Sequence, residues 1–469
     1  MLPQLITDPS VLGGFLTDAS NLPGRADGLV RPRTAEDVAE VLRHCQSAGI
    51  PVLPTAGRTS TTGGATPEGG WLMSMAAFDA LGEIGHDRAS AGAGAFLGVF
   101  QSAIEATGRF YPPDPTSRNE CTLGASVACN ASGARSFRYG ATRRWVEGVR
   151  VVLPTGEILD VRRGDPIPSD WPVPRWQEPA VKTAAGYPPP ESLLDLFVGT
   201  EGTLGVITDV TVRLTDLPSD VIGLIAFFPD RASALAFVEH ARGASRDDPQ
   251  GALSPRCLEY FDGGCLRMAG DRTTVPDGAG VALFCEQEVE ACGSDAHLEA
   301  WLEALSEHGA LVDDTILATD GPSRTRLLEL RHAIPAGINE RVVRNGMRKI
   351  GTDLAVPDAA LPRMMDLYEA SPVEHVLFGH IGDSHLHLNL LPATPEEAEQ
   401  AKAWYDQLAR EAIALGGTVS AEHGIGKLKR DHLRWMVGED VLASFRSLKE
   451  KLDPNGILGR GNVFEQGPL

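Results

Sequence analysis

Apolar and polar positions follow two patterns along this chain: short apolar stretches, which are typical of strands, and apolar residues at helical spacing. The change from one pattern to the other marks the boundaries of the predicted elements. Residues 29–54 contain a short apolar stretch, then apolar residues at helical spacing, then a second apolar stretch, IPVLP. Thr34, with Asp37 three residues later, provides an N-cap for the helix, and Gly49 ends it. The pattern therefore predicts strand–helix–strand over residues 29–54.

Three glycine-rich stretches mark the first 214 residues, at positions 56–70, 121–145 and 197–214. Glycine permits positive φ and lets backbone N–H groups approach a ligand closely, which makes anion-binding nests. Any one stretch is typical of turns between strands, as in the hairpin predicted over residues 146–161. Three stretches together, interleaved with Ser and Thr hydroxyls, favour an extended diphosphate ligand.

The two familiar phosphate-binding motifs do not account for these glycines. The nearest match to G-x-G-x-x-G is formed by Gly92, Gly94 and Gly98, and it is one residue too long. We interpret it as a turn from a strand into a helix. The chain contains no Walker A sequence either. The predicted cradle is therefore of another type.

Beyond about residue 215 the pattern of residues along the chain changes. Apolar strands such as 221–228 alternate with helices such as 231–242, and glycine clusters are few until about residue 415, where they return. This order predicts a separate second domain, a sheet with helices on one face. We expect the fold class to be α+β, with an antiparallel sheet in this second domain. The predicted domains are 1–214 and 215–415, with 416–469 returning to the first domain.

Composition and charge exclude several classes of partner. The chain has 42 basic and 63 acidic residues, a net charge of −21, which repels nucleic acid and anionic lipid surfaces. The seven cysteines are odd in number and include no C-x-x-C pair, which indicates reduced thiols and a cytoplasmic location. Neither a secretory signal nor an apolar run of about 20 residues is visible, so we expect no membrane segment.

Five of the twelve histidines lie between His375 and His423. From position 385 onward the alternation His-Leu-His-Leu-Asn-Leu predicts a strand with His385, His387 and Asn389 on one face. The preceding loop carries His380 and can fold back toward His387. The alternative interpretation is a polar strand face with a loop histidine that is hydrogen-bonded in a core.

A metal site explains this histidine cluster better than a core does. Two imidazoles and one carboxylate with a position left open form a catalytic zinc-type site. Here His380, His387 and Glu422 supply the three ligands, and His423 stays free to act as a base. Zn²⁺ is the expected ion, while Mn²⁺ and Fe²⁺ accept the same ligand set.

The order of four segments resembles the vanillyl-alcohol-oxidase flavoprotein superfamily, and within it the FAD-linked D-2-hydroxyacid dehydrogenases of the D-lactate, D-2-hydroxyglutarate and glycolate types. The segments are RPRTAEDVAEVL, IPVLPTAGRTSTTGGA, YPPDPTSRNECTLGASVACNASG and FVGTEGTLGVIT. The likeness extends to the final DPNGILGRGNVF and to the two histidine motifs. It implies a PCMH-type FAD-binding domain with two subdomains, plus a cap domain for substrate that carries the metal site.

The resemblance also implies which residues hold FAD. The pyrophosphate would lie on Gly57, Thr59, Ser60, Gly63 and Gly64. The flavin would be lined by Pro113, Asp114, Ser117, Thr122, Gly124, Asn130 and Gly133. Near the adenine half would lie Glu201, Gly205 and Ile207, and Asn462 would close the site.

Two departures from the family pattern affect these expectations. Arg58 stands where the family usually has a third glycine, so its side chain either contacts the phosphates or points to solvent. His385 follows Ser384 where the family commonly has Gly-Asn, and it is a supporting group, an alternative ligand or an exposed side chain; we favour the first. The only histidine between positions 45 and 239 is His86, and Cys121 is best explained as a packed thiol, so we expect non-covalent FAD.

A 2-hydroxyacid substrate needs a cation, and Arg331 matches a family position that grips the carboxylate. From spacing alone, an arginine paired with a neighbouring acid on a helix surface is an equal alternative. Pro335 stands where 2-hydroxyglutarate-type relatives have Thr, and Lys349 is a displaced candidate for a second cation. These changes favour a small or apolar acid. Asn389 would orient the substrate.

The sequence therefore predicts FAD- and metal-dependent oxidation of a D-lactate-like acid to the 2-oxoacid, with hydride passing from C2 to flavin N5 and His423 as base. Without a Rossmann motif, the expected acceptor is a quinone, a cytochrome or an electron-transfer protein. The alternatives are a metal-dependent hydrolase and a non-catalytic flavin subunit of a glycolate-oxidase-like complex. A homodimer is compatible with this sequence.

Overall fold

The first domain begins with a small parallel sheet, in the order β1-β3-β2. The computed structural model describes residues 2–270, 274–290, 294–318 and 321–465. The strands are β1 (Gly28–Val30), β2 (Val52–Thr55) and β3 (Trp71–Ser74). Helix α2 (Ala35–Ala48) connects β1 to β2, and Thr34 Oγ1 caps it by accepting the Asp37 N–H at 3.1 Å. The predicted strand–helix–strand is confirmed.

A five-stranded antiparallel sheet, in the order β4-β5-β9-β7-β8, forms the second half of this domain. Its strands are β4 (Leu81–Ile84), β5 (Arg88–Gly92), β7 (Val146–Val152), β8 (Ile158–Arg162) and β9 (Val206–Arg213). Helices α3 (Leu97–Glu105) and α4 (Leu123–Ala128) share its hydrophobic core. The predicted hairpin is β7–β8. The glycine-rich stretches lie in the loops around these two sheets.

The second domain is built on an eight-stranded antiparallel sheet, in the order β14-β11-β13-β12-β17-β18-β15, with β16 also paired to β18. Its strands are β11 (Asp220–Phe228), β12 (Cys257–Asp262), β13 (Val281–Val289), β14 (Ile316–Ala318), β15 (Ile350–Gly351), β16 (Leu354–Ala355), β17 (His375–His380) and β18 (His385–Leu390). The central strands are buried along most of their length. This sheet carries the predicted histidine strand.

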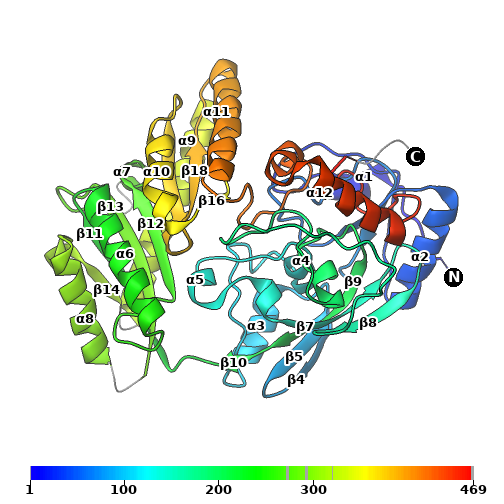
Figure 1. Ribbon diagram of the computed structural model, residues 1–469, viewed down its shortest axis with the longest axis horizontal. Helices are drawn as coiled ribbons and strands as arrows, with labels where there is room; N and C mark the ends of the chain where they lie inside the picture. Colours follow the sequence, from blue (N-terminus) through cyan, green and yellow to red (C-terminus); the bar gives the residue numbers. More distant parts are fainter. Residues whose placement is uncertain (1, 271–273, 291–293, 319–320, 466–469) are drawn as a thin grey trace.

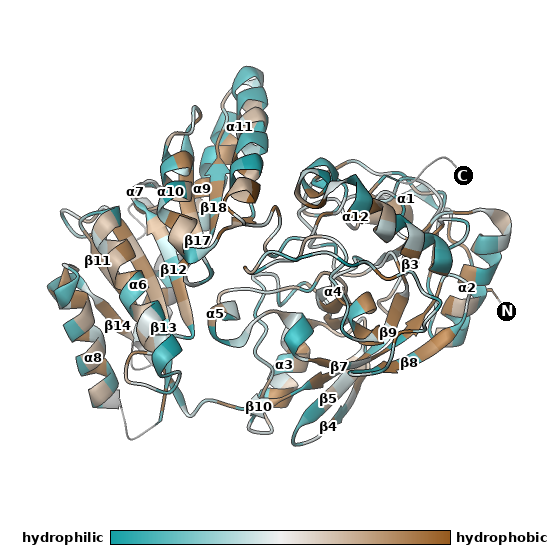
Figure 2. Ribbon diagram, in the orientation of Figure 1, coloured by the Kyte–Doolittle hydropathy of each residue, from teal (hydrophilic) through white to brown (hydrophobic). Residues whose placement is uncertain are grey.

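Helices cover both faces of this sheet, whereas the sequence predicts them on one. Leu224 and Phe228 of β11 belong to the core shared with α6 (Arg231–Asp247), α8 (Ser294–Glu307) and α10 (Leu361–Glu369). Phe227 points the opposite way, into a core shared with α7 (Gly263–Ala269) and α9 (Gly321–Asn345). The physical reason lies in β11, whose uninterrupted apolar run buries both faces. Figure 2 shows this concentration of hydrophobic residues in the strands.

The chain leaves the second domain after α11 (Pro395–Ala414) and returns to the first through α12 (Arg430–Leu452), which is kinked at Gly438 (Figure 1). Beyond α12, Leu458 forms a parallel bridge with Val52 of β2. None of the helices in the described ranges has the length and apolar character needed to cross a membrane.

Short elements complete the chain and join the domains. Strand β10 (Thr215–Asp216) pairs with β6 (Arg109–Phe110) just beyond the predicted limit at residue 214, and α11 ends just before the predicted limit at residue 415. The remaining helical turns are α1 (Pro9–Leu12), η1 (Gly13–Phe15), α5 (Ser136–Tyr139), η2 (Thr142–Arg144), η3 (Leu193–Phe197), η5 (Val312–Asp314), η6 (Asp358–Ala360) and η7 (Ile381–Asp383).

Candidate active site

A groove of about 440 Å³ lies in the first domain, and Glu422 and His423 are among the residues that line it. All three glycine-rich stretches contribute to its walls, together with Asn462 from the returning segment. The groove therefore brings together the segments that the sequence predicts to hold a diphosphate, and it places them beside the predicted metal site.

Twelve of the predicted cofactor residues line this groove: Gly57, Arg58, Thr59, Ser60, Gly64, Ser117, Thr122, Gly124, Glu201, Gly205, Ile207 and Asn462. The other five lie outside the lining: Gly63, Pro113, Asp114, Asn130 and Gly133. Several of these five engage neighbouring protein groups instead. The carbonyl of Gly63 accepts from Lys427 Nζ at 3.1 Å, and Asn130 Oδ1 accepts the Arg143 N–H at 2.9 Å.

The first glycine-rich loop has the chemistry of a diphosphate cradle. Gly57 has to be glycine because a Cβ there would lie 2.1 Å from the carbonyl oxygen of Glu120. Arg58 adopts φ of 55°, which costs about 1–2 kcal/mol for an L-residue, and its guanidinium lies 4.8 Å from the Phe15 ring centroid. Ser60 Oγ accepts the Gly64 N–H at 3.1 Å. A cation and hydroxyls on a tightly packed loop suit an anionic cofactor.

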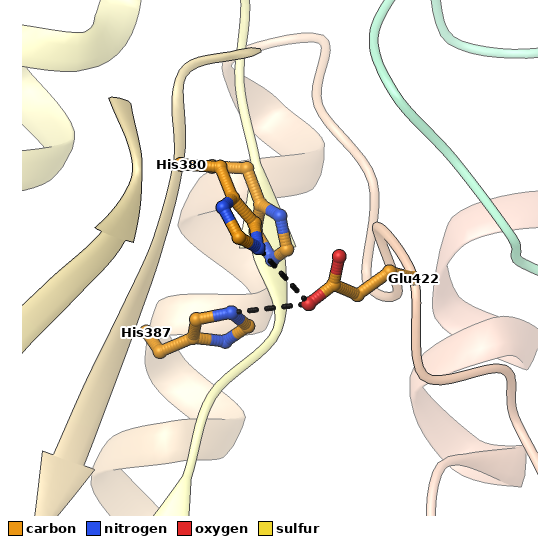
Figure 3. Close-up of side chains that lie close together, drawn as sticks. His380, His387 and Glu422 are labelled. Atoms are coloured by element: carbon orange, nitrogen blue, oxygen red, sulfur yellow. Dashed lines mark ion pairs between the residues drawn. The ribbon is translucent and has the colours of Figure 1, made fainter. Parts of the chain in front are cut away.

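The predicted metal ligands converge at the domain boundary (Figure 3). Glu422 Oε1 lies 3.5 Å from His380 Nε2 and 3.3 Å from His387 Nε2. His380 is the last residue of β17 rather than a loop residue. The short η7 turn leads from His380 into β18, so His380 lies at the end of the sheet where β18 begins. All three side chains are nearly buried.

Each of these two imidazoles turns its other nitrogen toward a protein oxygen. His387 Nδ1 donates to the carbonyl of Thr352 at 3.0 Å, and His380 Nδ1 lies 3.2 Å from Glu259 Oε1. Both Nε2 atoms therefore face Glu422, as in histidine metal sites whose outer nitrogen is held by an acceptor. Burial opposes a proton on His380, but the carboxylates of Glu422 and Glu259 outweigh it and raise its pKa to about 9. The surroundings of His380 therefore stabilise a positive charge.

Lys182 is a member of the site that the sequence did not reveal. Its Nζ lies 2.8 Å from Glu422 Oε2 and 3.7 Å from Asp383 Oδ2, and its side chain is nearly buried. Burial lowers the pKa of Lys182, but these two carboxylates outweigh burial and raise it. The lysine holds one oxygen of Glu422, which leaves Oε1 facing the histidines. Ser132 Oγ, 3.3 Å from Oε2, supports the same geometry.

Asp353 is a second missed residue, and it organises the loop that carries Glu422 and His423. Its fully buried carboxylate accepts the backbone N–H of Glu422 at 3.2 Å and that of His423 at 3.0 Å. Lys429 Nζ and Ser420 Oγ donate to the same carboxylate at 2.6 and 2.8 Å. Burial alone would raise the pKa of Asp353, but the positive charge of Lys429 holds it well below its usual range.

His423 lines the groove and also contacts two of the predicted metal ligands. Its Nε2 is 3.7 Å from Glu422 Oε1, its Nδ1 is 3.6 Å from Asp353 Oδ2, and its ring stacks on His387 with centroids 5.2 Å apart. Desolvation lowers the pKa of His423 to about 4, against the opposing charge of Asp353. The imidazole is therefore neutral near pH 7 and able to accept a proton.

Two of the three predicted substrate residues lie together. Lys349 Nζ donates to Asn389 Oδ1 at 2.9 Å, and Asn389 follows His387 by two positions on β18. Burial lowers the pKa of Lys349. Arg331 belongs to α9, but its side chain falls outside the described part of the structure.

Comparison with known proteins agrees with this architecture. The family model "FAD binding domain" matches residues 26–162, and "FAD linked oxidases, C-terminal domain" matches residues 217–463, more than half of the chain. The chain therefore belongs to the FAD-linked oxidases and is an FAD-dependent oxidoreductase.

Three curated relatives align over most of their length. The D-lactate dehydrogenase of Anaerostipes hadrus is 30% identical, over 96% of this chain and 92% of its own. The D-2-hydroxyglutarate dehydrogenase of Xanthomonas citri pv. viticola is 30% identical, over 92% and 88%. The glycolate oxidase subunit GlcD of Bacillus subtilis is 28% identical, over 93% and 89%. The family predicted from the sequence motifs is confirmed.

Solved structures share the fold at lower identity. The 4-ethylphenol oxidase from Gulosibacter chungangensis superposes with a TM-score of 0.70 at 17% identity, covering 98% of this chain and 94% of its own. An alkyldihydroxyacetonephosphate synthase superposes with a TM-score of 0.70 at 17% identity, covering 97% and 83%. The predicted α+β fold class, with a PCMH-type FAD-binding domain, is confirmed.

Proposed function

We propose that this protein oxidises a D-2-hydroxyacid to the 2-oxoacid, using FAD in the groove and a divalent metal ion held by His380, His387 and Glu422. The observation that carries the proposal is the adjacency of the two sites: Glu422 belongs to the metal cluster and, with His423, also lines the groove. A substrate on the metal would meet the cofactor directly. The names of the relatives, D-lactate and D-2-hydroxyglutarate dehydrogenase, support the substrate class.

The residues have separate roles in this reaction. A metal ion, when bound, polarises the carboxylate and hydroxyl oxygens of the acid. His423, neutral and partly exposed beside the cluster, takes the hydroxyl proton. Asn389 and Lys349 orient the substrate, and Arg331 is proposed to grip its carboxylate. FAD supplies hydride acceptance at N5.

The FAD is proposed to be non-covalent. Two cysteines line the groove, and burial raises the pKa of Cys121 to about 11 and that of Cys129 to about 12. Both groups are thiols rather than thiolates near pH 7 and are poor nucleophiles toward the cofactor. The electrons are proposed to leave to a quinone, a cytochrome or an electron-transfer protein.

Anaerobic flavin bleaching tests the proposal. The purified protein is mixed with D- and L-lactate, D-2-hydroxyglutarate and glycolate, before and after treatment with a chelator. We expect a yellow protein whose flavin is bleached by a small D-acid and not by its L-isomer. Removal of the metal ion by the chelator should abolish this bleaching. A colourless protein, or a yellow one that bleaches equally well after complete metal removal, would contradict the proposal.

A further inference from the structure

His385 adds a third imidazole to the metal cluster. It is the first residue of β18 and the register partner of His380, and none of its side chain is exposed. Its ring centroid lies 4.4 Å from that of His387 and 5.5 Å from that of His380. One ring nitrogen from each histidine and one oxygen of Glu422 lie within 4.8 Å of one another. The chain thus gathers four donors where three were predicted.

The surroundings of His385 repeat those of the other two histidines. Its Nε2 lies 2.9 Å from Asp353 Oδ1, just as His387 and His380 each turn one nitrogen to Thr352 or Glu259. With Nε2 carrying the proton toward Asp353, Nδ1 keeps a bare lone pair. Neither ring nitrogen of His385 has a hydrogen bond of good geometry among the described residues, and Nδ1 lacks even the close carboxylate that Nε2 has in Asp353. An unsatisfied buried acceptor is costly, and a cation removes that cost.

We propose that His385 is a fourth protein ligand of the metal ion, through Nδ1, beside His380, His387 and Glu422. This inference rests on the proposed metal-dependent function. Two ligand atoms at about 2.0–2.2 Å from one ion lie at most about 4.4 Å apart, and only when they face each other across the ion, so the four donors, which all lie within 4.8 Å of one another, must draw together when an ion binds. Asp353 then holds His385 by its outer nitrogen, as carboxylates commonly do for metal-bound histidine.

Four protein ligands change which ion suits the site. A tetrahedral Zn²⁺ with four protein donors has no position left for substrate. A six-coordinate ion keeps two positions, which match the carboxylate and hydroxyl oxygens of a 2-hydroxyacid. The inferred coordination therefore favours a six-coordinate ion such as Mn²⁺ or Fe²⁺ over the Zn²⁺ expected from three ligands. Elemental analysis of the purified protein distinguishes these ions.

Cobalt substitution tests the ligand count directly. The FAD-loaded protein is stripped of metal and reloaded with Co²⁺, and exchangeable N–H protons of the bound imidazoles are counted as hyperfine-shifted proton NMR signals. We expect three such signals in the wild type and two in His385→Asn. Competition with a chelator should show Co²⁺ bound at least tenfold more weakly by His385→Asn. The matched control is His375→Asn on β17, whose ring nitrogen Nδ1 faces the Val373 carbonyl, and it should keep three signals.

Other outcomes separate this inference from the proposed function. Two signals in the wild type, with unchanged Co²⁺ affinity in His385→Asn, would overturn the inference and leave His385 as a support for Asp353. If His385→Asn does not fold, the wild-type count alone decides. A wild-type protein that binds FAD but no Co²⁺ would overturn the metal-dependent function together with the fourth ligand.

Discussion

The carboxylate of Glu201 accepts the backbone N–H of Gly426 at 2.7 Å, across 225 residues of sequence, and accepts the N–H of Ile425 at the same distance. Glu201 lies in the third glycine-rich stretch and lines the groove, with φ of 53°. Its carboxylate is therefore engaged by the loop that carries Glu422 and His423. One side chain thus links the wall of the groove to the loop of the proposed metal ligand Glu422.

Glu201→Gln should loosen that loop. The amide has one acceptor oxygen, and its NH₂ opposes the second N–H, so a buried donor is left unpaired at a cost of about 1–3 kcal/mol. For a chain of 469 residues we expect a melting temperature lower by about 1–2 °C per kcal/mol. Glu157→Gln, on the exposed β7–β8 turn, is the control. Identical melting of Glu201→Gln and the wild type would show that the two hydrogen bonds add no stability.

His423→Gln should separate proton transfer from cofactor binding. The variant keeps the metal ligands and the groove, so bound FAD and metal content should match the wild type. Loss of the proposed general base should slow substrate-driven bleaching by about 10²–10⁴-fold, measured by stopped-flow absorbance. Bleaching at the wild-type rate would assign the base to another group.

Lys182→Met should make the metal more important for stability. Without the ammonium, the buried Glu422 carboxylate loses its partner, and breaking such a pair costs about 3–5 kcal/mol. A bound divalent cation restores the missing positive charge. The rise in melting temperature on adding metal should therefore be larger in Lys182→Met than in the wild type. Lys182→Arg is the control that retains the charge. An equal rise in all three proteins would contradict this role.

Arg58→Gly should weaken FAD binding without weakening the fold. Glycine relaxes the positive φ, while the lost guanidinium removes a cation from the groove. One charged hydrogen bond is worth about 1.5–3 kcal/mol, so the Kd for FAD should rise about tenfold or more in equilibrium titrations. Arg58→Lys should retain part of the affinity. Unchanged FAD binding in Arg58→Gly would place the side chain away from the cofactor.

Most of the predictions made from the sequence came from patterns among residues that are close together in the chain. Alternation along β18 placed His387 and Asn389 on one face, and the capped apolar helix after Thr34 was recognisable from its spacing. Lys182 left no comparable signal, because it lies in a proline- and tryptophan-rich segment 240 residues from its partner Glu422. Asp353 could be recognised only from the structure, in which the pairing of β16 with β18 places it beside the site.

The return of the chain to its first domain also determines when that domain can complete its folding during synthesis. Asn462 Nδ2 donates to the carbonyl of Gly64 at 2.8 Å, 398 residues away, and Val52 donates its N–H to Ile457. At about 5–20 residues per second, a ribosome needs on the order of 20–80 s to make the intervening chain. The nascent first domain must wait that long with an open sheet edge and an incomplete groove. The lining of the groove is therefore completed late, by a nearly full-length polypeptide.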